Sequence, residues 1–469
     1  MPRVTHRTRV PAVRSAALVV LALVTGCTPS STSSPTSPRS SASDSPARTA
    51  TASAALSESL VIVGRIVTMD EPSVAEAILI EDGTVAAVGQ RDEVLALAGE
   101  HVPVMNIGRN VAYPGFIDAH AHWIGDRDRY GLPTAADAMD AALSRGWTSI
   151  SEQWVNRERL DELEQLAANA QLPIRVDAYL ALNAPEPGGE HFGNWYADRE
   201  PGPITARLRV QGVKIHLDTG FTLDLLWDTD ELNATVAAAN EAGWQVSIHA
   251  FSKEAQEMAL DAFEAAIGPN GPNPLRHRIE HNIQVTDAQL ARMVAMNVPT
   301  VIHLDTAVAD WLGGPDSLAD LGGDTAWLTR WKDFADAGLH VAAATDMPWI
   351  LPDFKLTDDI GRPVDQIAGG MDPRGRTYPE PPAWMASQLL TAEQGLRAVT
   401  LDAAYALRDE AKRGHLAIGT YGDVTILSGD LTGGATPDEI RAMTVIATIV
   451  GGAVAFCGDQ AVCVPASAP

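Results

Sequence analysis

The stretch Val111-Ala-Tyr-Pro-Gly-Phe-Ile-Asp-Ala-His-Ala-His122 is an apolar run that ends in two histidines one residue apart. We predict a β-strand over residues 111–118, because the run is short and apolar. Successive side chains of a strand point to opposite faces, so Asp118, His120 and His122 should share one face at the strand's end. Neutral imidazoles placed in this way can bind one divalent metal ion; a hydrogen-bonded, chemically inert pair is the alternative. Two histidines do not decide between these interpretations, so further ligands must come from elsewhere in the chain.

The first 58 residues have the composition of an export signal followed by a tether. Four arginines flank the start of the apolar segment Ala16–Val24, which is too short for a membrane-spanning helix and is typical of a secretory signal over residues 1–26. The sequence Val24-Thr-Gly-Cys27 resembles a bacterial lipobox, which predicts that Cys27 is lipidated; a plain signal peptide is the alternative. Residues 27–58 are almost all Ser, Thr, Pro and Ala, which predicts a disordered tether. We therefore expect an exported lipoprotein, anchored to the outer face of the bacterial cell membrane through this lipid alone.

The charge and size of the chain restrict its partners. It carries 34 Lys and Arg residues against 60 Asp and Glu residues, a net charge of −26. This sign opposes attraction to phosphate backbones, so we expect a small-molecule substrate and no nucleic acid. The roughly 410 residues after the tether suit a large barrel with an accessory domain. The oligomeric state is left open, with a homo-oligomer as one possibility.

The two ends of the folded part contain short strand patterns. Strands are predicted at 60–68, 77–89, 422–427 and 443–450, with a hairpin turn at Asp82-Gly83. Neither end has enough strands for a stable sheet. We therefore predict one small β-sandwich built from residues 59–113 and 406–456; two unrelated hairpins are the alternative. In the tail, residues 457–469, Cys457 and Cys463 could form a disulfide or remain two free thiols.

The central part alternates strand and helix. Eight strands are predicted, at 111–118, 147–153, 174–181, 209–216, 244–249, 276–281, 298–303 and 340–345. Helical periodicity lies between most of them, for example over Leu160–Ala170, Glu231–Ala242 and Lys253–Ile267. Eight alternating units predict an α/β fold, a (β/α)8 TIM barrel, over residues 114–405. Sites in this fold lie at the carboxyl ends of the strands.

Groups that bind metals occur at five of these strand ends. They are His120 and His122, Lys214, His249, His281, and Asp346. A single terminal histidine is usually structural, but this combination predicts a metal site.

These motifs resemble those of the amidohydrolase superfamily of metal-dependent hydrolases. The likeness covers residues 60 to 456 and rests on Pro114-Gly-Phe-Ile-Asp-x-His-x-His122, together with the ligand set above. Gly212-Val-Lys214, Arg278-Ile-Glu-His281 and Ala344-Thr-Asp346 resemble its YtcJ-like branch, amidohydrolase family 3. The chain departs from that branch in lacking a large insertion between the first two barrel strands. It also has Leu217-Asp-Thr-Gly220 where Asp-Gly is more usual.

The resemblance implies a site with two divalent metal ions. Zinc is expected first, with iron, manganese, cobalt or nickel as alternatives. A carboxylated Lys214 would bridge the two ions; His120, His122 and Asp346 would complete one, and His249 and His281 the other. A metal-bound hydroxide would then cleave an amide or other non-peptide C–N bond, with Asp346 as the proton shuttle.

Other functions and contacts remain open from the sequence. A mononuclear, deaminase-like hydrolase would use Glu280 or Asp346 to move protons and leave Lys214 idle. A non-catalytic binding lipoprotein on the same scaffold is an alternative of a different class. Five residues near strand ends are predicted to contact substrate, each with a structural role as the alternative: His216, His303, Trp123, Trp154 and Trp349.

Overall fold

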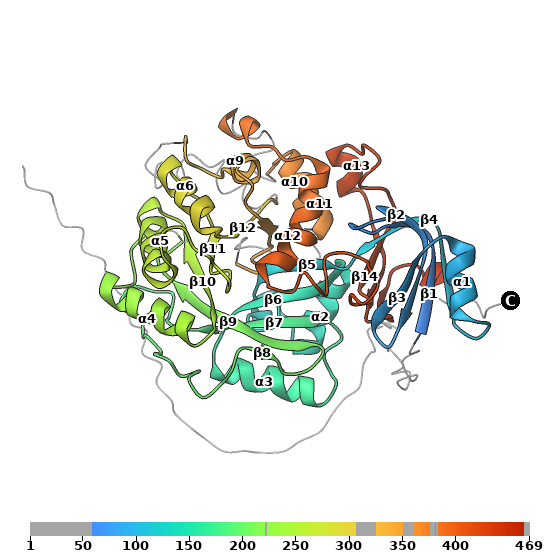
Figure 1. Cartoon of the computed structure of the whole chain (residues 1–469), viewed down its shortest axis with the longest axis horizontal. Helices are drawn as coiled ribbons and strands as arrows, with labels where there is room; N and C mark the ends of the chain where they lie inside the picture. Colours follow the sequence, from blue (N-terminus) through green and yellow to red (C-terminus); the bar gives the residue numbers. More distant parts are fainter. Residues whose placement is uncertain are drawn as a thin grey trace, which may run out of the picture. The chain divides into compact units, whose positions relative to one another are not determined.

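The computed structural model describes residues 59–220, 223–305, 325–349, 360–375, 380 and 383–463. The predicted signal peptide, Cys27 and the tether lie outside these residues. Two sheets organise the described part, one with eight barrel strands and one with seven strands (Figure 1). No helix within the described ranges is both long and apolar enough to cross a bilayer.

The barrel strands follow one another in chain order, and each pair of neighbours is parallel. They are β5 (Phe116–Ala121), β6 (Trp147–Val155), β7 (Arg175–Ala181), β9 (Leu208–His216), β10 (Gln245–Ala250), β11 (Arg278–His281), β12 (Thr300–Ile302) and β13 (Val341–Ala343). A short strand, β8 (Gly202–Pro203), pairs with β9 from the side. Beyond β13, the Asp346 amide donates to the His120 carbonyl at 2.9 Å, which draws the last strand to the first. The predicted barrel is therefore confirmed as a nearly closed parallel sheet.

Helices alternate with the strands and cover the barrel from outside (Figure 1). They are α2 (Ala135–Ser144), α3 (Arg157–Ala168), α4 (Thr229–Glu241), α5 (Lys253–Ile267), α6 (Asp287–Met296), α9 (Trp331–Asp336), α10 (Pro363–Met371), α11 (Ala392–Ala398) and α12 (Leu401–Ala406). Helix α5 shows why they form. Ser252 caps its first turn by accepting from the Ala255 amide, and Ala259, Leu260 and Phe263 recur at helical spacing on its buried face.

The two chain ends combine in the second sheet, whose strand order is β16-β15-β14-β4-β1-β2-β3. Its strands are β1 (Ser59–Val67), β2 (Val74–Glu81), β3 (Thr84–Gly89), β4 (Val104–Pro114), β14 (Val424–Leu427), β15 (Val445–Val450) and β16 (Ala453–Cys457). The ends meet where β4 pairs with β14, with Ala112 opposite Ile426. Helix α1 (Arg91–Ala98) packs on one face, while α13 (Pro437–Arg441) and α14 (Gln460–Cys463) lie in the C-terminal part. Cys457 and Cys463 form a disulfide with Cα atoms 6.0 Å apart.

The predicted strand 111–118 is wrong as a single element, because the chain changes sheets within it. Val111–Pro114 is the end of β4 in the seven-stranded sheet, and the barrel strand β5 begins only at Phe116. Gly115 makes the junction, and its amide donates to the Asp423 carbonyl at 2.8 Å. A Cβ at this position would lie 2.3 Å from Oγ1 of Thr148, so only glycine lets the two sheets approach.

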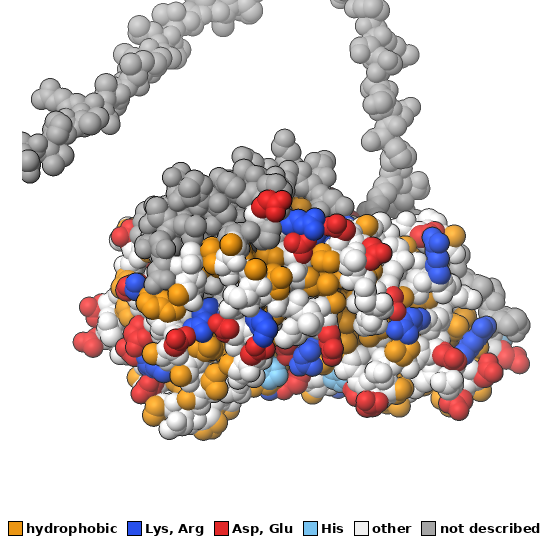
Figure 2. Space-filling model, turned by 90° about the horizontal axis from the view of Figure 1, so that it is seen from above, with side chains coloured by type: hydrophobic (Ala, Val, Ile, Leu, Met, Phe, Trp, Pro, Cys, Tyr) orange, Lys and Arg blue, Asp and Glu red, His pale blue; other side chains and the backbone are white. Residues whose placement is uncertain are grey.

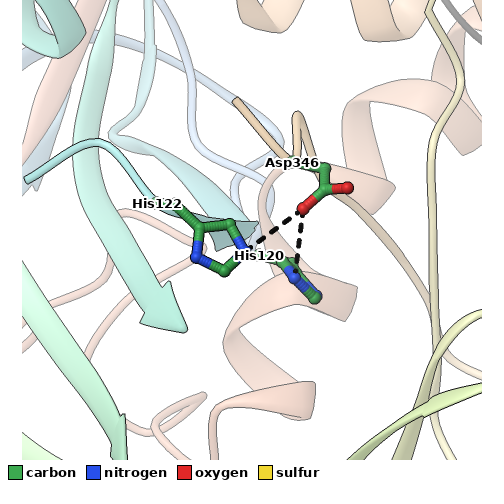
Figure 3. A group of neighbouring side chains, drawn as sticks. All are labelled: His120, His122 and Asp346. Carbon is green, nitrogen blue, oxygen red and sulfur yellow. Dashed lines mark ion pairs between the residues drawn. The ribbon is translucent and has the colours of Figure 1, made fainter. Parts of the chain in front are cut away.

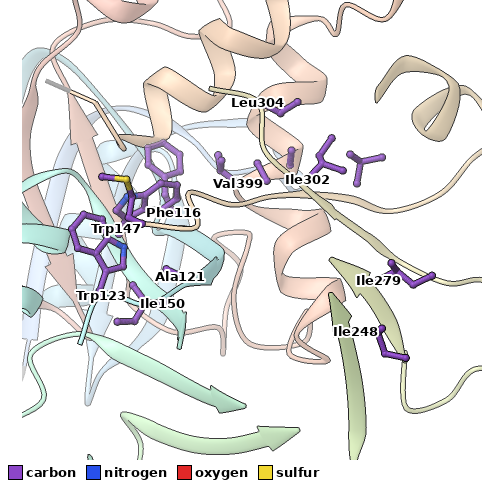
Figure 4. Packing of buried hydrophobic residues seen from close by; sticks show 14 of the residues in the cluster. Phe116, Ala121, Trp123, Trp147, Ile150, Ile248, Ile279, Ile302, Leu304 and Val399 are labelled. Carbon is purple, nitrogen blue, oxygen red and sulfur yellow. The ribbon is translucent and has the colours of Figure 1, made fainter. Parts of the chain in front are cut away.

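The main core lies between the barrel strands and their helices. Figure 4 shows Phe116, Trp123, Trp147 and Ile150 packed together at the start of the barrel, all of them buried. The surface differs from this apolar core. In Figure 2, acidic side chains lie between basic ones and exposed apolar groups. The first barrel strand, β5, is buried along its whole length, and its start lies among these aromatic side chains.

Candidate metal centre

Three side chains converge at the carboxyl end of the barrel (Figure 3). The Nε2 atoms of His120 and His122 lie 3.3 Å and 3.4 Å from the same oxygen, Oδ1 of Asp346. Ligand atoms around a tetrahedral ion with bonds of about 2.0 Å are separated by about 3.3 Å. The spacing therefore fits three ligands of one metal ion.

The protonation of His120 supports this interpretation. Burial, followed by the nearby Lys214, lowers the pKa of His120 to about 4, so its ring is neutral near pH 7. Its Nδ1 lies 2.7 Å from Oε2 of Glu280, a contact that requires the ring's one proton on Nδ1. Nε2 then presents a lone pair toward the Asp346 carboxylate. Two such lone pairs repel each other unless a cation lies between them.

Both carboxylate oxygens of Glu280 have partners that favour its ionised form. Oε1 accepts from the Ser247 hydroxyl at 2.8 Å and lies 2.8 Å from Nε of Arg278, which is itself fully buried. Burial alone would raise the pKa of Glu280, but Arg278 and the bond from His120 lower it to about 2. Glu280 therefore orients the ring of a candidate ligand, in the way that carboxylates behind ligand histidines usually do. This placement disfavours Glu280 as the proton carrier of the deaminase-like alternative and leaves Asp346 for that role.

The other predicted ligands surround the same point. The His281 ring lies 4.9 Å from that of His120 and 4.4 Å from that of His249, centroid to centroid. Lys214 is fully buried, and its Nζ has no hydrogen-bond partner among the described residues. The same holds for Nε2 of His249, although Oδ1 of Asp218 lies 3.4 Å away. Orphaned polar atoms of this kind fit groups that bind an ion or are chemically modified.

Backbone conformation at the site is unusual for residues other than glycine. His281, Asn282 and Asp346 have φ values of 73°, 50° and 51°, in the left-handed region. Such conformations are uncommon in L-residues and persist where the surroundings enforce them. Asn282 stabilises its own turn by donating from Nδ2 to the Ile279 carbonyl at 2.7 Å. Two of the candidate ligands are thus presented at or just after strand ends, His281 as the last residue of β11 and Asp346 beyond β13.

Asp118 does not join the two histidines as a ligand. Its carboxylate accepts from the Thr345 amide at 2.9 Å, from the Thr345 hydroxyl at 2.6 Å and from the Trp123 indole at 3.0 Å. Burial raises its pKa to about 6. Asp118 therefore fixes the residue that precedes Asp346. Trp123 is fully buried in this role, so the prediction that it walls a pocket is corrected to its structural alternative.

The other predicted substrate contacts differ in how far they are exposed to solvent. Trp349 is 43% exposed, with its ring 6.4 Å from that of His122 and the Arg129 guanidinium 3.4 Å above it. The His216 ring lies 5.1 Å from that of His249, which places it beside the candidate ligands. Trp154 is half-buried and donates to the Asn183 carbonyl at 2.8 Å. His303 is buried, and both of its ring nitrogens are occupied.

Three carboxylates near the site were not predicted. Asp126 lies 3.6 Å from Nδ1 of His122 and accepts from the Trp349 indole at 2.7 Å. Glu152 is buried on β6, and burial raises its pKa to about 7 although the amides of Ile124 and Gly125 donate to it. Asp218 accepts from the Ser252 amide at 2.7 Å, at the start of α5. An acidic residue at the end of an apolar strand was the available signal for Glu152.

Comparisons with known proteins agree with this geometry. Residues 130–456 match the amidohydrolase family. The chain is 24% identical over 317 residues to YtcJ of Bacillus subtilis (strain 168), a provisionally assigned amidohydrolase, covering 62% of this chain and 54% of that protein. It is 22% identical over 343 residues to the N-substituted formamide deformylase of Arthrobacter pascens, covering 68% and 59%. The chain spans about half the length of the curated relatives it matches first.

A solved structure supports the fold. An uncharacterized metal-dependent hydrolase from Pyrococcus horikoshii OT3 superimposes with a TM-score of 0.66 at 18% identity, over 81% of this chain and 99% of the other. The likeness to this structure concerns the fold, and the match over residues 130–456 shows that the chain belongs to the amidohydrolase family.

Proposed function

We propose that this protein hydrolyses an amide or another non-peptide C–N bond of a small molecule in a metal-dependent reaction. The observation that carries the proposal is the placement of the His120 and His122 nitrogens at ligand spacing around one oxygen of Asp346. The formamide deformylase among its relatives is named for cleavage of such a bond. A site made of histidine nitrogens and a carboxylate oxygen suits divalent metals that favour nitrogen ligands, with zinc first among them.

We assign the ligands of two ions from the described side chains. His120, His122 and Asp346 would hold one, and His249 and His281 the other, with Lys214 between them. When bound, the ions would lower the pKa of a coordinated water and polarise the substrate carbonyl. The buried amine of Lys214, which has no hydrogen-bond partner in the described part of the chain, supports carboxylation: its nitrogen would form a bond to carbon dioxide and release a proton, giving a bridging anion. An ammonium at this position would instead repel both ions.

Asp346 would move the proton during bond cleavage. As the attacking water forms its bond to the carbonyl carbon, the Asp346 carboxylate would accept one proton from that water. It would then deliver this proton to the nitrogen as the C–N bond breaks, so that the amine leaves neutral. Trp349 stands at the mouth, near His122, and would form part of the substrate's apolar contact.

Metal analysis and a substrate screen test the proposal together. Protein purified in bicarbonate with added zinc would be analysed for metal content and assayed on N-substituted formamides, other amides, lactams and esters. We expect about two ions per chain by the assignment above and turnover of at least one amide class. Asp346→Asn should abolish turnover, whereas Glu257→Gln, which alters an exposed carboxylate paired with Arg292, should not. One ion per chain would favour a mononuclear enzyme; metal-loaded protein without any turnover would favour a binding protein.

We also propose that the chain is exported and anchored through lipidated Cys27. The support is the Val24-Thr-Gly-Cys27 sequence after an apolar segment. In a bacterial host, the protein should fractionate with membranes and be released by Cys27→Ser. A Cys27→Ser variant that remains membrane-bound would contradict this proposal.

A further inference from the structure

We propose that His303 is a positioning residue that fixes the tautomer of His281 and thereby turns Nε2 of His281 toward the metal. The inference rests on the proposed metal-dependent function. Two contacts carry it. Nε2 of His303 lies 2.6 Å from Nδ1 of His281, and Nδ1 of His303 lies 2.9 Å from the carbonyl oxygen of Ala344.

The proton positions follow from the chemistry of these partners. A backbone carbonyl only accepts, so Nδ1 of His303 carries a proton. A neutral His303 then has a bare Nε2, which accepts from Nδ1–H of His281. The remaining nitrogen of His281, Nε2, keeps its lone pair, and a neutral imidazole nitrogen is the form that binds metals. The chain from Ala344 through His303 to His281 therefore selects which nitrogen of His281 is a ligand.

The same distances argue against His303 as a ligand beside His281. Two nitrogens that bind one tetrahedral ion at about 2.0 Å would be about 3.3 Å apart. The His120–Asp346 and His122–Asp346 pairs meet that value at 3.3 Å and 3.4 Å, whereas the His281–His303 pair is far shorter, at 2.6 Å. A spacing of 2.6 Å is a hydrogen bond. With both nitrogens engaged and 4% exposure, His303 also has no free atom for a substrate.

The support for His303 comes from the strand that presents Asp346. His303 follows β12, and the Ala344 amide donates to the Ile302 carbonyl at 2.9 Å, so the two strands are fixed to each other at this point. Ala344 precedes Asp346 by two residues. The orientation of one candidate ligand is thus set by the backbone that carries another. His120 has the corresponding arrangement, with Glu280 in place of an imidazole.

Two variants at one position separate positioning from packing. His303→Gln keeps a carbonyl that accepts from His281 and an amide that donates to Ala344. His303→Leu removes both groups. Zinc affinity would be measured by competition with a chelator, and the tautomer of His281 by ¹⁵N spectra of histidine-labelled protein. We expect His303→Leu to weaken binding of one ion by roughly 10- to 100-fold and to shift the His281 signals, with His303→Gln close to wild type.

The outcomes distinguish this inference from the proposed function. Wild-type protein that binds no metal would defeat the proposed function itself. Wild-type protein that binds metal, with His303→Leu binding it equally well, would overturn the role of His303 alone, as would a higher KM with unchanged metal content. If His303→Leu does not fold by circular dichroism, His303→Asn replaces it, since its shorter amide can reach Ala344 but not His281. His303→Asn should then lose affinity as His303→Leu would.

Discussion

Replacing Glu280 by Gln keeps the shape of the side chain and removes its charge, and should destabilise the metal-free protein by roughly 3 kcal/mol. Glu280 is fully buried and meets the Arg278 guanidinium, the Ser247 hydroxyl and Nδ1 of His120, all within 2.8 Å. The amide would leave Arg278 buried without an anion. Arg278 would retain its bond to the Ala119 carbonyl at 2.9 Å and its position over the Tyr179 ring, which limits the loss.

The lowered pKa of Glu280, which reflects the same contacts, corresponds to a similar magnitude. It falls from its ordinary value of 4.5 to about 2 in the folded protein. At about 1.4 kcal/mol for each tenfold change in proton affinity, this lowering corresponds to roughly 3 kcal/mol. Because the folded-state pKa is depressed, the stabilisation is complete above about pH 4.5 and disappears as the pH falls through about 2.

Urea unfolding of metal-free protein between pH 7 and pH 2 measures both effects. Between pH 7 and pH 2, the free energy of unfolding of wild type should fall by roughly 3 kcal/mol more than that of Glu280→Gln. Glu257→Gln is the matched control, because Glu257 is 53% exposed and pairs with Arg292 at 2.8 Å; it should lose less than about 1 kcal/mol. A loss below about 1 kcal/mol for Glu280→Gln, or a pH dependence equal to that of wild type, would refute the reasoning.

Three further changes test other parts of the structure. Lys214→Ala should remove at least one metal ion and most turnover, and full metal content by elemental analysis would contradict a bridging role. Gly115→Ala should destabilise the protein by about 3 kcal/mol in urea unfolding, because its Cβ would meet Oγ1 of Thr148 at 2.3 Å; a loss near zero would show that the junction can relax. Cys457→Ser should lower stability by about 2 kcal/mol through the opened loop to Cys463, and should make thermal unfolding insensitive to reductant.

Much of the site could be predicted because barrel topology sends the ends of parallel strands to one edge. His120, His249 and His281 could be placed together from their positions at strand ends alone. The order and direction of the strands follow from the alternation of strand and helix, with no need for side-chain detail. Helix α5 was predicted with its observed bounds, since its apolar spacing and its Ser252 cap agree.

The contacts behind the ligands could not be predicted, because they depend on register between strands. Glu280 reaches His120 across 160 residues of sequence, and no periodicity connects the two. His303 was predicted as a substrate contact because its position at a strand end does not reveal that both nitrogens are occupied. The first half of β4 was missed because Asn106, Gly108 and Arg109 interrupt its apolar pattern. Strand β16 was not predicted, because its five residues after the turn glycines make only a short apolar run.

The direct passage from β4 into β5 at Gly115 has a consequence for how the protein is made. The start of the first barrel strand is held by Asp423, whose carbonyl accepts from the Gly115 amide and whose side chain binds Arg175 at the base of the barrel. Those bonds come from a segment more than 300 residues downstream. A chain that emerges from its N-terminus onward therefore lacks the partner that binds the start of β5, the strand that leads to His120 and His122, until most of it has been synthesised. An incomplete chain would carry the histidines on a strand whose start is not yet bonded to its C-terminal partner, so the junction between the two sheets is completed by the last part of the protein to appear.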